Sequence, residues 1–219
     1  MFCFRNKYTI SNLNTPTQKL QQIDRGRFKI AVVDNEPFVY EDRLKAIGFN
    51  ITKYDDVSNL DMLSSYNVII GDIKGVGKSF NSEFEGAFVL KELKRRYPFK
   101  AFAAYTGSAY DIRINDLLNG VQIIKKDIDI DSWSNAIDAL IKESCDPKII
   151  WKKTRDILLS KDVNVNDVAK LENEYVDIII NKKGDFSHFP SEKNKKKLSA
   201  DTIEIISTIA VKAVLSTLI

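Results

Sequence analysis

The chain has 219 residues, of which 44% are hydrophobic and 29% are charged. This is the composition of a globular protein, and it excludes a chain that is disordered throughout. The formal net charge of +3 is small, so the chain as a whole is not built to bind polyanions.

In chain order, the first 26 residues have no periodic pattern and are predicted to form an extended leader. From residue 27 onward, short apolar runs alternate with helical patterns. The apolar runs predict strands at residues 28–33, 50–54, 68–70, 101–105 and 121–124. Each run is followed by a segment with helical spacing, at residues 37–48, 60–66, 84–97, 112–118 and 133–141.

The five strand–helix repeats indicate the fold class. Strands that alternate with helices form a parallel sheet that carries helices on both faces. These strands are continuously apolar, as is typical of strands buried on both faces. We therefore expect residues 27–146 to form an α/β domain with a five-stranded, doubly wound parallel sheet.

The pattern changes after Asp146-Pro147, and no further strand is predicted. Residues 148–159, 165–180 and 201–219 have helical spacing. The last of these segments is apolar on more than one side, so it must be buried within 147–219, in a dimer interface or against a partner protein. We expect residues 147–219 to be a C-terminal α-helical extension that serves in output or dimerisation.

Polar side chains gather where the predicted strands end, and this edge of an open α/β sheet is where ligands bind. Oxygen ligands suit Mg²⁺, and a carboxylate can act as a nucleophile toward phosphorus. A lysine and a hydroxyl can neutralise the charge of a transferring phosphoryl group. The residues at these strand ends are Asp34, Asn35 and Glu36 after the first strand, Asp72 after the third, Thr106 after the fourth, and Lys125 and Lys126 after the fifth.

Four short motifs in this order resemble the receiver domains of response regulators, over about residues 28–145: VVDNEP, VIIGDIK, AAYTG and IIKKD. The resemblance implies a CheY-like, flavodoxin-like receiver fold. It also implies that Asp72 is the phospho-acceptor and that Thr106 is the hydroxyl that follows the phosphoryl group. Lys126 would be the charge partner of the phosphoryl group, with Lys125 as the alternative.

The same resemblance implies a Mg²⁺ site formed by Asp34, Asn35 and Asp72, with Glu36 as a further candidate ligand. The chain departs from the family pattern at several positions, of which two bear directly on the site. Asn35 supplies a neutral carbonyl oxygen where the family usually has a second acidic residue, so we expect weaker metal binding. Ile123 stands where the family has its switch aromatic, so we do not expect the family's aromatic switch in this chain.

The resemblance implies a two-component signalling protein that a partner histidine kinase or phosphotransfer protein phosphorylates on Asp72. Output would pass through protein contacts of the C-terminal helices, to a downstream protein partner or to a homodimer formed through 147–219. One alternative is an unphosphorylated pseudo-receiver that acts as a scaffold or adaptor. A second is a DNA-binding transcriptional regulator, which is disfavoured because 147–219 has no helix-turn-helix spacing and a single basic loop.

Several remaining features point away from other classes of protein. Residues 75–79 (GVGKS) resemble only the tail of a phosphate-binding loop, and no Ser/His/Asp set or metal triad is present, so we expect no enzyme. Cys3 and Cys145 form no metal-binding or disulfide pattern. We find no signal peptide and no run of membrane-spanning length, so we expect a cytoplasmic protein without a membrane partner.

Overall fold

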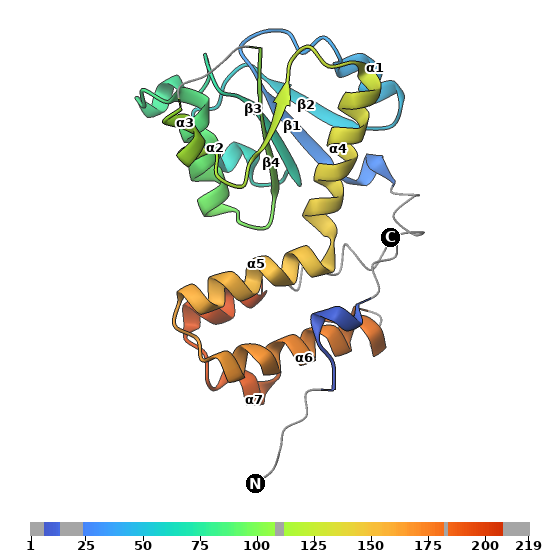
Figure 1. The fold of residues 1–219 in the computed structure, drawn as a ribbon, viewed down its shortest axis with the longest axis vertical. Coiled ribbons are helices and arrows are strands. Elements are labelled where there is room, and N and C mark those ends of the chain that lie inside the picture. The colour runs from blue at the N-terminus through green and yellow to red at the C-terminus, as the bar shows by residue number, and fades with distance from the viewer. Residues whose placement is uncertain (1–6, 14–23, 108–111, 182–183, 208–219) are drawn as a thin grey trace. The chain divides into compact units, whose positions relative to one another are not determined.

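The computed structural model describes residues 7–13, 24–107, 112–181 and 184–207 (Figure 1). The chain divides into two compact units. One unit is Asp24–Ser144, and the other consists of the described parts of residues 1–23 and 145–219. The first unit contains the sheet, and the second is helical.

The first unit is built on a sheet of five parallel strands in the spatial order β2-β1-β3-β4-β5. The predicted doubly wound parallel sheet is therefore confirmed. The chain order reverses between β1 and β3. The carboxyl ends of these two strands therefore form the switch point at which such sheets bind ligands. The strands are β1 (Lys29–Val33), β2 (Asn50–Tyr54), β3 (Val68–Asp72), β4 (Ala101–Thr106) and β5 (Gln122–Lys125).

Helices cover both faces of this sheet. Figure 1 shows α2 (Glu85–Arg96) and α3 (Ile114–Leu117) on one face, and α1 (Glu41–Ala46) and α4 (Ile130–Cys145) on the other. Nearly every residue of the central strands β1, β3 and β4 is buried, whereas the outer strands β2 and β5 are partly exposed. The continuous apolar runs of the central strands follow from this double covering.

Three helical segments are shorter than the sequence predicts. The helix expected at 37–48 begins only at Glu41, and the helix expected at 112–118 is reduced to the single turn of α3. The helix expected at 60–66 is reduced to a 3-10 helix, Leu60–Leu63. Residues 37–40 remain outside α1 because they form one wall of a pocket beside the sheet edge.

The strand register decides which residues meet at the carboxyl edge. Neighbouring strands end nearly level, so their last residues lie in adjacent rows. The paired residues at this edge are Val33 with Gly71, Asp72 with Tyr105, and Thr106 with Lys125. The residues that follow β1, β3 and β5 are therefore brought to one place.

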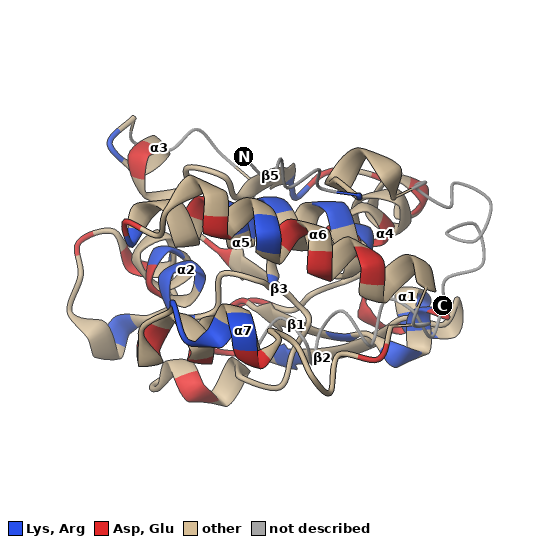
Figure 2. Ribbon diagram, turned by 90° about the horizontal axis from the view of Figure 1, so that it is seen from below, with Lys and Arg blue, Asp and Glu red and all other residues tan. Residues whose placement is uncertain are grey.

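The second unit contains α5 (Pro147–Ser160), α6 (Val165–Asn181) and the short α7 (Glu192–Lys195). Asp146 begins α5, because its carboxylate accepts hydrogen bonds from the first backbone N–H groups of that helix. Residues 200–207 are also helical, and the remainder of the helix predicted at 201–219 lies outside the described residues. The helices α5, α6 and α7 all carry both signs of charge (Figure 2).

An aromatic stack and one glutamate hold the second unit together. The rings of Trp151 and Tyr175 stack with their centroids 5.0 Å apart. Glu172 accepts hydrogen bonds from Trp151 Nε1 at 2.7 Å and from the backbone N–H of Ile10 at 2.9 Å. The described part of the predicted extended leader thus contains a 3-10 helix, Ile10–Asn12, tied to α6. Among the described residues, no helix is long and apolar enough to cross a membrane.

Candidate functional site

Two carboxylates stand at the carboxyl edge of the sheet. Asp34 directly follows β1, and only 2% of it is exposed. Its Oδ1 accepts a hydrogen bond from the backbone N–H of Glu36 at 2.8 Å, which fixes the turn after the strand. Asp72 is the last residue of β3, and its Oδ1 accepts from the backbone N–H of Lys74 at 3.3 Å.

The backbone of Asp72 is also in close contact with the first turn of α2. A Cβ added to Gly86 would lie 1.9 Å from the backbone oxygen of Asp72. Only glycine therefore allows the first turn of α2 to approach the end of β3 this closely. The position of Asp72 thus depends on a close contact between strand and helix as well as on its own hydrogen bonds.

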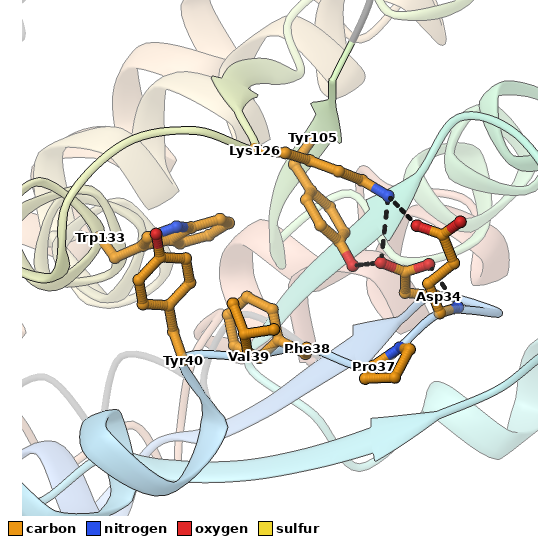
Figure 3. Close-up of a pocket in the computed structure, with 9 residues that line it drawn as sticks. Asp34, Pro37, Phe38, Val39, Tyr40, Tyr105, Lys126 and Trp133 are labelled. Atoms are coloured by element: carbon orange, nitrogen blue, oxygen red, sulfur yellow. Dashed lines mark hydrogen bonds and ion pairs between the residues drawn. The ribbon is translucent and has the colours of Figure 1, made fainter.

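Lys126 joins the two carboxylates. It follows β5, and its Nζ lies 2.7 Å from Asp72 Oδ2. The same Nζ lies 3.2 Å from Asp34 Oδ2 (Figure 3). Glu36 is more distant, with its Oε2 3.8 Å from the same ammonium and its side chain 71% exposed. The alternative lysine, Lys125, is exposed and is the last residue of β5. The geometry therefore brings Lys126 into the site and leaves Lys125 outside it.

The electrostatics of this trio follow from burial and from charge pairing. Burial raises the pKa of Asp72, and the hydrogen bond from Lys126 offsets only part of that rise. Burial lowers the pKa of Lys126, but its hydrogen bonds to Asp72 and Asp34 outweigh burial, so this pKa lies above its usual value. Lys126 is therefore a cation at neutral pH, and it lies where it can contact a group bound to the carboxylate of Asp72.

Tyr105 belongs to the site, although no motif in the sequence marks it. Its side chain is buried, and its hydroxyl donates a hydrogen bond to Asp34 Oδ2. Burial, and then the contact with Asp34, raises the pKa of Tyr105 far above its ordinary value, so the hydroxyl keeps its proton. One signal in the sequence was available: a tyrosine inside a buried strand needs a hydrogen-bond partner.

Two predicted site residues are placed less centrally. Thr106 ends β4, is partly exposed, and accepts a hydrogen bond at its backbone oxygen from the N–H of Lys126 at 3.0 Å. Asn35 is exposed and lies against the loop after β3, where a Cβ added to Gly75 would be 2.2 Å from Asn35 Oδ1. Both residues therefore stand at the same edge as Asp72.

A pocket of about 200 Å³ opens beside Asp34. Figure 3 shows its wall of aromatic rings next to Asp34 and Lys126. Its lining combines charged groups with a largely apolar surface, which is typical of a ligand site. The lining residues are Asp34, Glu36, Pro37, Phe38, Val39, Tyr40, Tyr105, Lys126 and Trp133.

The donor set at this edge fits Mg²⁺ in its chemistry. Asp34, Asp72 and Asn35 offer hard oxygen atoms, and Mg²⁺ needs only one or two carboxylates when water and phosphate oxygens complete its shell. The described residues contain no group of three or more His, Cys, Asp or Glu able to hold a metal. Because Lys126 and Tyr105 already contact Asp34 Oδ2, a cation there would compete with both of them.

Comparison with known proteins gives a mixed result. No protein-family model matches the sequence, and no curated protein matches it. Solved structures similar to the chain include a response regulator receiver domain protein from Clostridium thermocellum, with 23% identity, a TM-score of 0.43, and coverage of 53% of this chain and 95% of that one.

Two further similar structures also cover about half of this chain. Chemotaxis protein CheY4 from Vibrio cholerae is 14% identical, with a TM-score of 0.42 and coverage of 52% of this chain and 98% of that one. A CheY-like receiver domain protein from Methanospirillum hungatei is 19% identical, with a TM-score of 0.44 and coverage of 53% and 95% respectively. The strand order of the sheet itself defines the class: it is the flavodoxin-like receiver fold.

Proposed function

We propose that the chain is a cytoplasmic signalling protein whose sheet unit receives a phosphoryl group on Asp72 from a partner histidine kinase or phosphotransfer protein. The observation that supports this most is the trio at the switch point, with Lys126 bridging Asp72 at 2.7 Å and Asp34 at 3.2 Å. A carboxylate in this position can attack a phosphorus atom while a fixed cation neutralises the charge that develops. In this proposal the chain is a phosphoryl acceptor rather than an enzyme.

The reaction is a displacement at phosphorus. A carboxylate oxygen of Asp72 forms a bond to phosphorus, and the bond from phosphorus to the donor nitrogen of a phosphohistidine breaks, which gives an acyl phosphate. Lys126 transfers its hydrogen bond from the free carboxylate to a phosphoryl oxygen, and the hydroxyl of Thr106 is the candidate donor to another. Asp34, Asp72 and Asn35 would hold Mg²⁺, which supplies further neutralisation of phosphoryl charge when bound.

Output would pass through the C-terminal helices. We propose that a downstream protein, or a second copy of the chain, binds the unit formed by α5, α6 and α7 and the helical residues 200–207. Basic residues predominate on α5 and acidic residues on α6, and this combination of opposite charges suits a protein partner better than nucleic acid (Figure 2).

Phosphorylation is tested directly with a small donor. The full chain is incubated with acetyl phosphate and Mg²⁺, and its intact mass is measured. We expect one added phosphoryl group, which Asp72→Asn abolishes. The matched control is Asp55→Asn, because Asp55 follows the neighbouring strand β2 and its side chain is 87% exposed. The absence of an adduct with any donor, or an adduct that persists in Asp72→Asn, would overturn the proposal.

The competing function is a scaffold that works by protein contact alone. The neutral Asn35 at the proposed metal site and the 41% exposed Ile123 favour this alternative, because the metal site and the aromatic switch then both depart from the receiver pattern. A scaffold predicts that deletion of residues 199–219 changes the oligomeric mass or the copurifying partner, whereas Asp72→Asn changes neither.

A further inference from the structure

Tyr105 occupies an acceptor atom that a metal ion at this site would need. Its hydroxyl donates to Asp34 Oδ2, which also lies 3.2 Å from Lys126 Nζ. The other oxygen, Oδ1, accepts from the backbone N–H of Glu36. Three donors from the protein therefore surround a carboxylate that is almost completely buried.

The ring of Tyr105 packs against two aromatic rings, Phe38 and Trp133, which also contact each other. Its centroid is 6.1 Å from that of Phe38 and 5.7 Å from that of Trp133, with edge-to-face geometry in both pairs. Lys126 Nζ lies 4.8 Å from the centre of the same ring. Figure 3 shows the hydroxyl end of Tyr105 pointing at Asp34. The hydroxyl is thus placed by a rigid frame, which makes it a fixed donor rather than a mobile one.

We propose that Tyr105 is a positioning residue that holds Asp34 in its metal-free arrangement and passes a displacement of Asp34 to Trp133 in α4. The inference rests on the proposed function only in that it assigns the Mg²⁺ site to Asp34. A divalent cation and a hydroxyl hydrogen compete for the same carboxylate oxygen. The hydroxyl must therefore weaken binding of the cation, and its release must free the ring to shift.

Trp133 is suited to register such a shift. Its Nε1 is buried and has no hydrogen-bond partner among the described residues. A buried N–H without a partner is unfavourable, so a small movement of the cluster that supplies an acceptor would be stabilised. The hydroxyl of Tyr40 is one candidate acceptor in the cluster, with the Tyr40 ring centroid 6.0 Å from that of Trp133.

The test uses the indole N–H signals of the full-length protein labelled with ¹⁵N. The chain contains two tryptophans, and Trp151→Phe assigns the signal of Trp133. Mg²⁺ alone is titrated into wild type, into Tyr105→Phe and into a control, Tyr54→Phe. Tyr54 is a suitable control because its hydroxyl pairs with that of Tyr66 at 2.8 Å, while its contact with Asp34 is through the backbone, which the substitution keeps.

In wild type and in Tyr54→Phe, we expect Mg²⁺ to shift the Trp133 signal. In Tyr105→Phe, we expect Mg²⁺ to bind more tightly, by a factor on the order of ten for one lost charge-assisted hydrogen bond, and the Trp133 signal to stay unchanged. Equal Mg²⁺ affinity in wild type and Tyr105→Phe, a Trp133 shift that persists in that variant, or no Mg²⁺ response in any protein would overturn the inference.

Should Tyr105→Phe fail to fold, wild type labelled with 3-fluorotyrosine gives a second test. The fluorine signal of Tyr105 must then move with Mg²⁺ at the same midpoint as the Trp133 signal, and a Tyr105 signal that does not move overturns the inference. No phosphoryl donor is present in either titration. A chain that is never phosphorylated on Asp72 can therefore still pass this test, and one that is phosphorylated can fail it.

Discussion

Replacing Lys126 with methionine removes the cation between two buried carboxylates and keeps an unbranched side chain only one atom shorter. The side chains of Asp34 and Asp72 are only 3% and 10% exposed, so water cannot replace the lost partner fully. Removing one member of a buried ion pair leaves an uncompensated charge, which costs more than the pair contributes as a whole.

The size of the effect follows from the two contacts of the ammonium. Hydrogen bonds to charged groups contribute about 1.5–3 kcal/mol each, and Lys126 makes two of them, at 2.7 Å and 3.2 Å. Its side chain is 26% exposed, so solvent screening reduces the sum. We expect Lys126→Met to lower the free energy of unfolding by about 2–3 kcal/mol.

Urea unfolding measures this loss. Trp133 fluorescence in a Trp151→Phe background reports on the Asp24–Ser144 unit alone, because the chain has two tryptophans. Lys125→Met is the matched control, and this exposed neighbour should change stability by no more than about 0.5 kcal/mol.

The pH dependence has a definite sign. Burial already raises the pKa of Asp72 in the folded protein, and loss of the hydrogen bond from Lys126 raises it further above the unfolded value. The penalty is therefore present above the unfolded pKa and disappears as the pH falls below it. A loss equal to that of Lys125→Met, or one that is unchanged in acid, would refute this description of the site.

Three further predictions concern individual residues. Because burial raises the pKa of Asp72, its ionised form destabilises the fold, and Asp72→Asn should raise the melting temperature at neutral pH. This gain should disappear as the pH falls toward the pKa of a free carboxyl. A lower melting temperature of Asp72→Asn at neutral pH would contradict the prediction. Gly86→Ala should cost roughly 2 kcal/mol or more in urea unfolding, since its Cβ would meet a backbone oxygen, whereas Gly107→Ala, whose Cβ would have only a lysine side chain at 3.8 Å, should be nearly neutral. Glu172→Gln should destabilise the helical unit by about 1 kcal/mol and change the fluorescence of Trp151, because the indole loses a charged acceptor; an unchanged spectrum would count against this contact.

The sheet was predictable from the sequence because its signals are local. The predicted strand at 50–54 coincides with β2, and the runs at 28–33, 68–70, 101–105 and 121–124 fall within one or two residues of the observed bounds. A buried parallel strand is marked by an apolar run and a polar stop, and both are written in consecutive residues. The position of Asp34, Asp72 and Lys126 at one edge then follows from strand order alone.

The role of Tyr105 was not predictable in the same way. Its partner, Asp34, is 71 residues away in the chain, and the contact depends on the register of β3 with β4 and on ring packing against α4. The late start of α1 has a similar cause. Pro37 is a good first residue of a helix, but residues 37–40 instead line the pocket, where tertiary packing overrides a local preference.

The short helices were the least predictable elements. A helix of one turn, such as α3 or the 3-10 helix Ile10–Asn12, gains little from its own hydrogen bonds and is stable only where the rest of the chain packs on it. The hydrogen bond from the N–H of Ile10 to Glu172 is one such contact, and the sequence near residue 10 does not predict it.

The central claim is that Asp72 accepts a phosphoryl group, and locating the modified residue tests it most directly. After incubation with acetyl phosphate and Mg²⁺, borohydride reduces an aspartyl phosphate to homoserine, and peptide mass spectrometry then identifies the altered position. We predict homoserine at residue 72, absent when the phosphoryl donor is left out. Homoserine at another aspartate, or none in a chain shown by its circular dichroism to be folded, would contradict the claim.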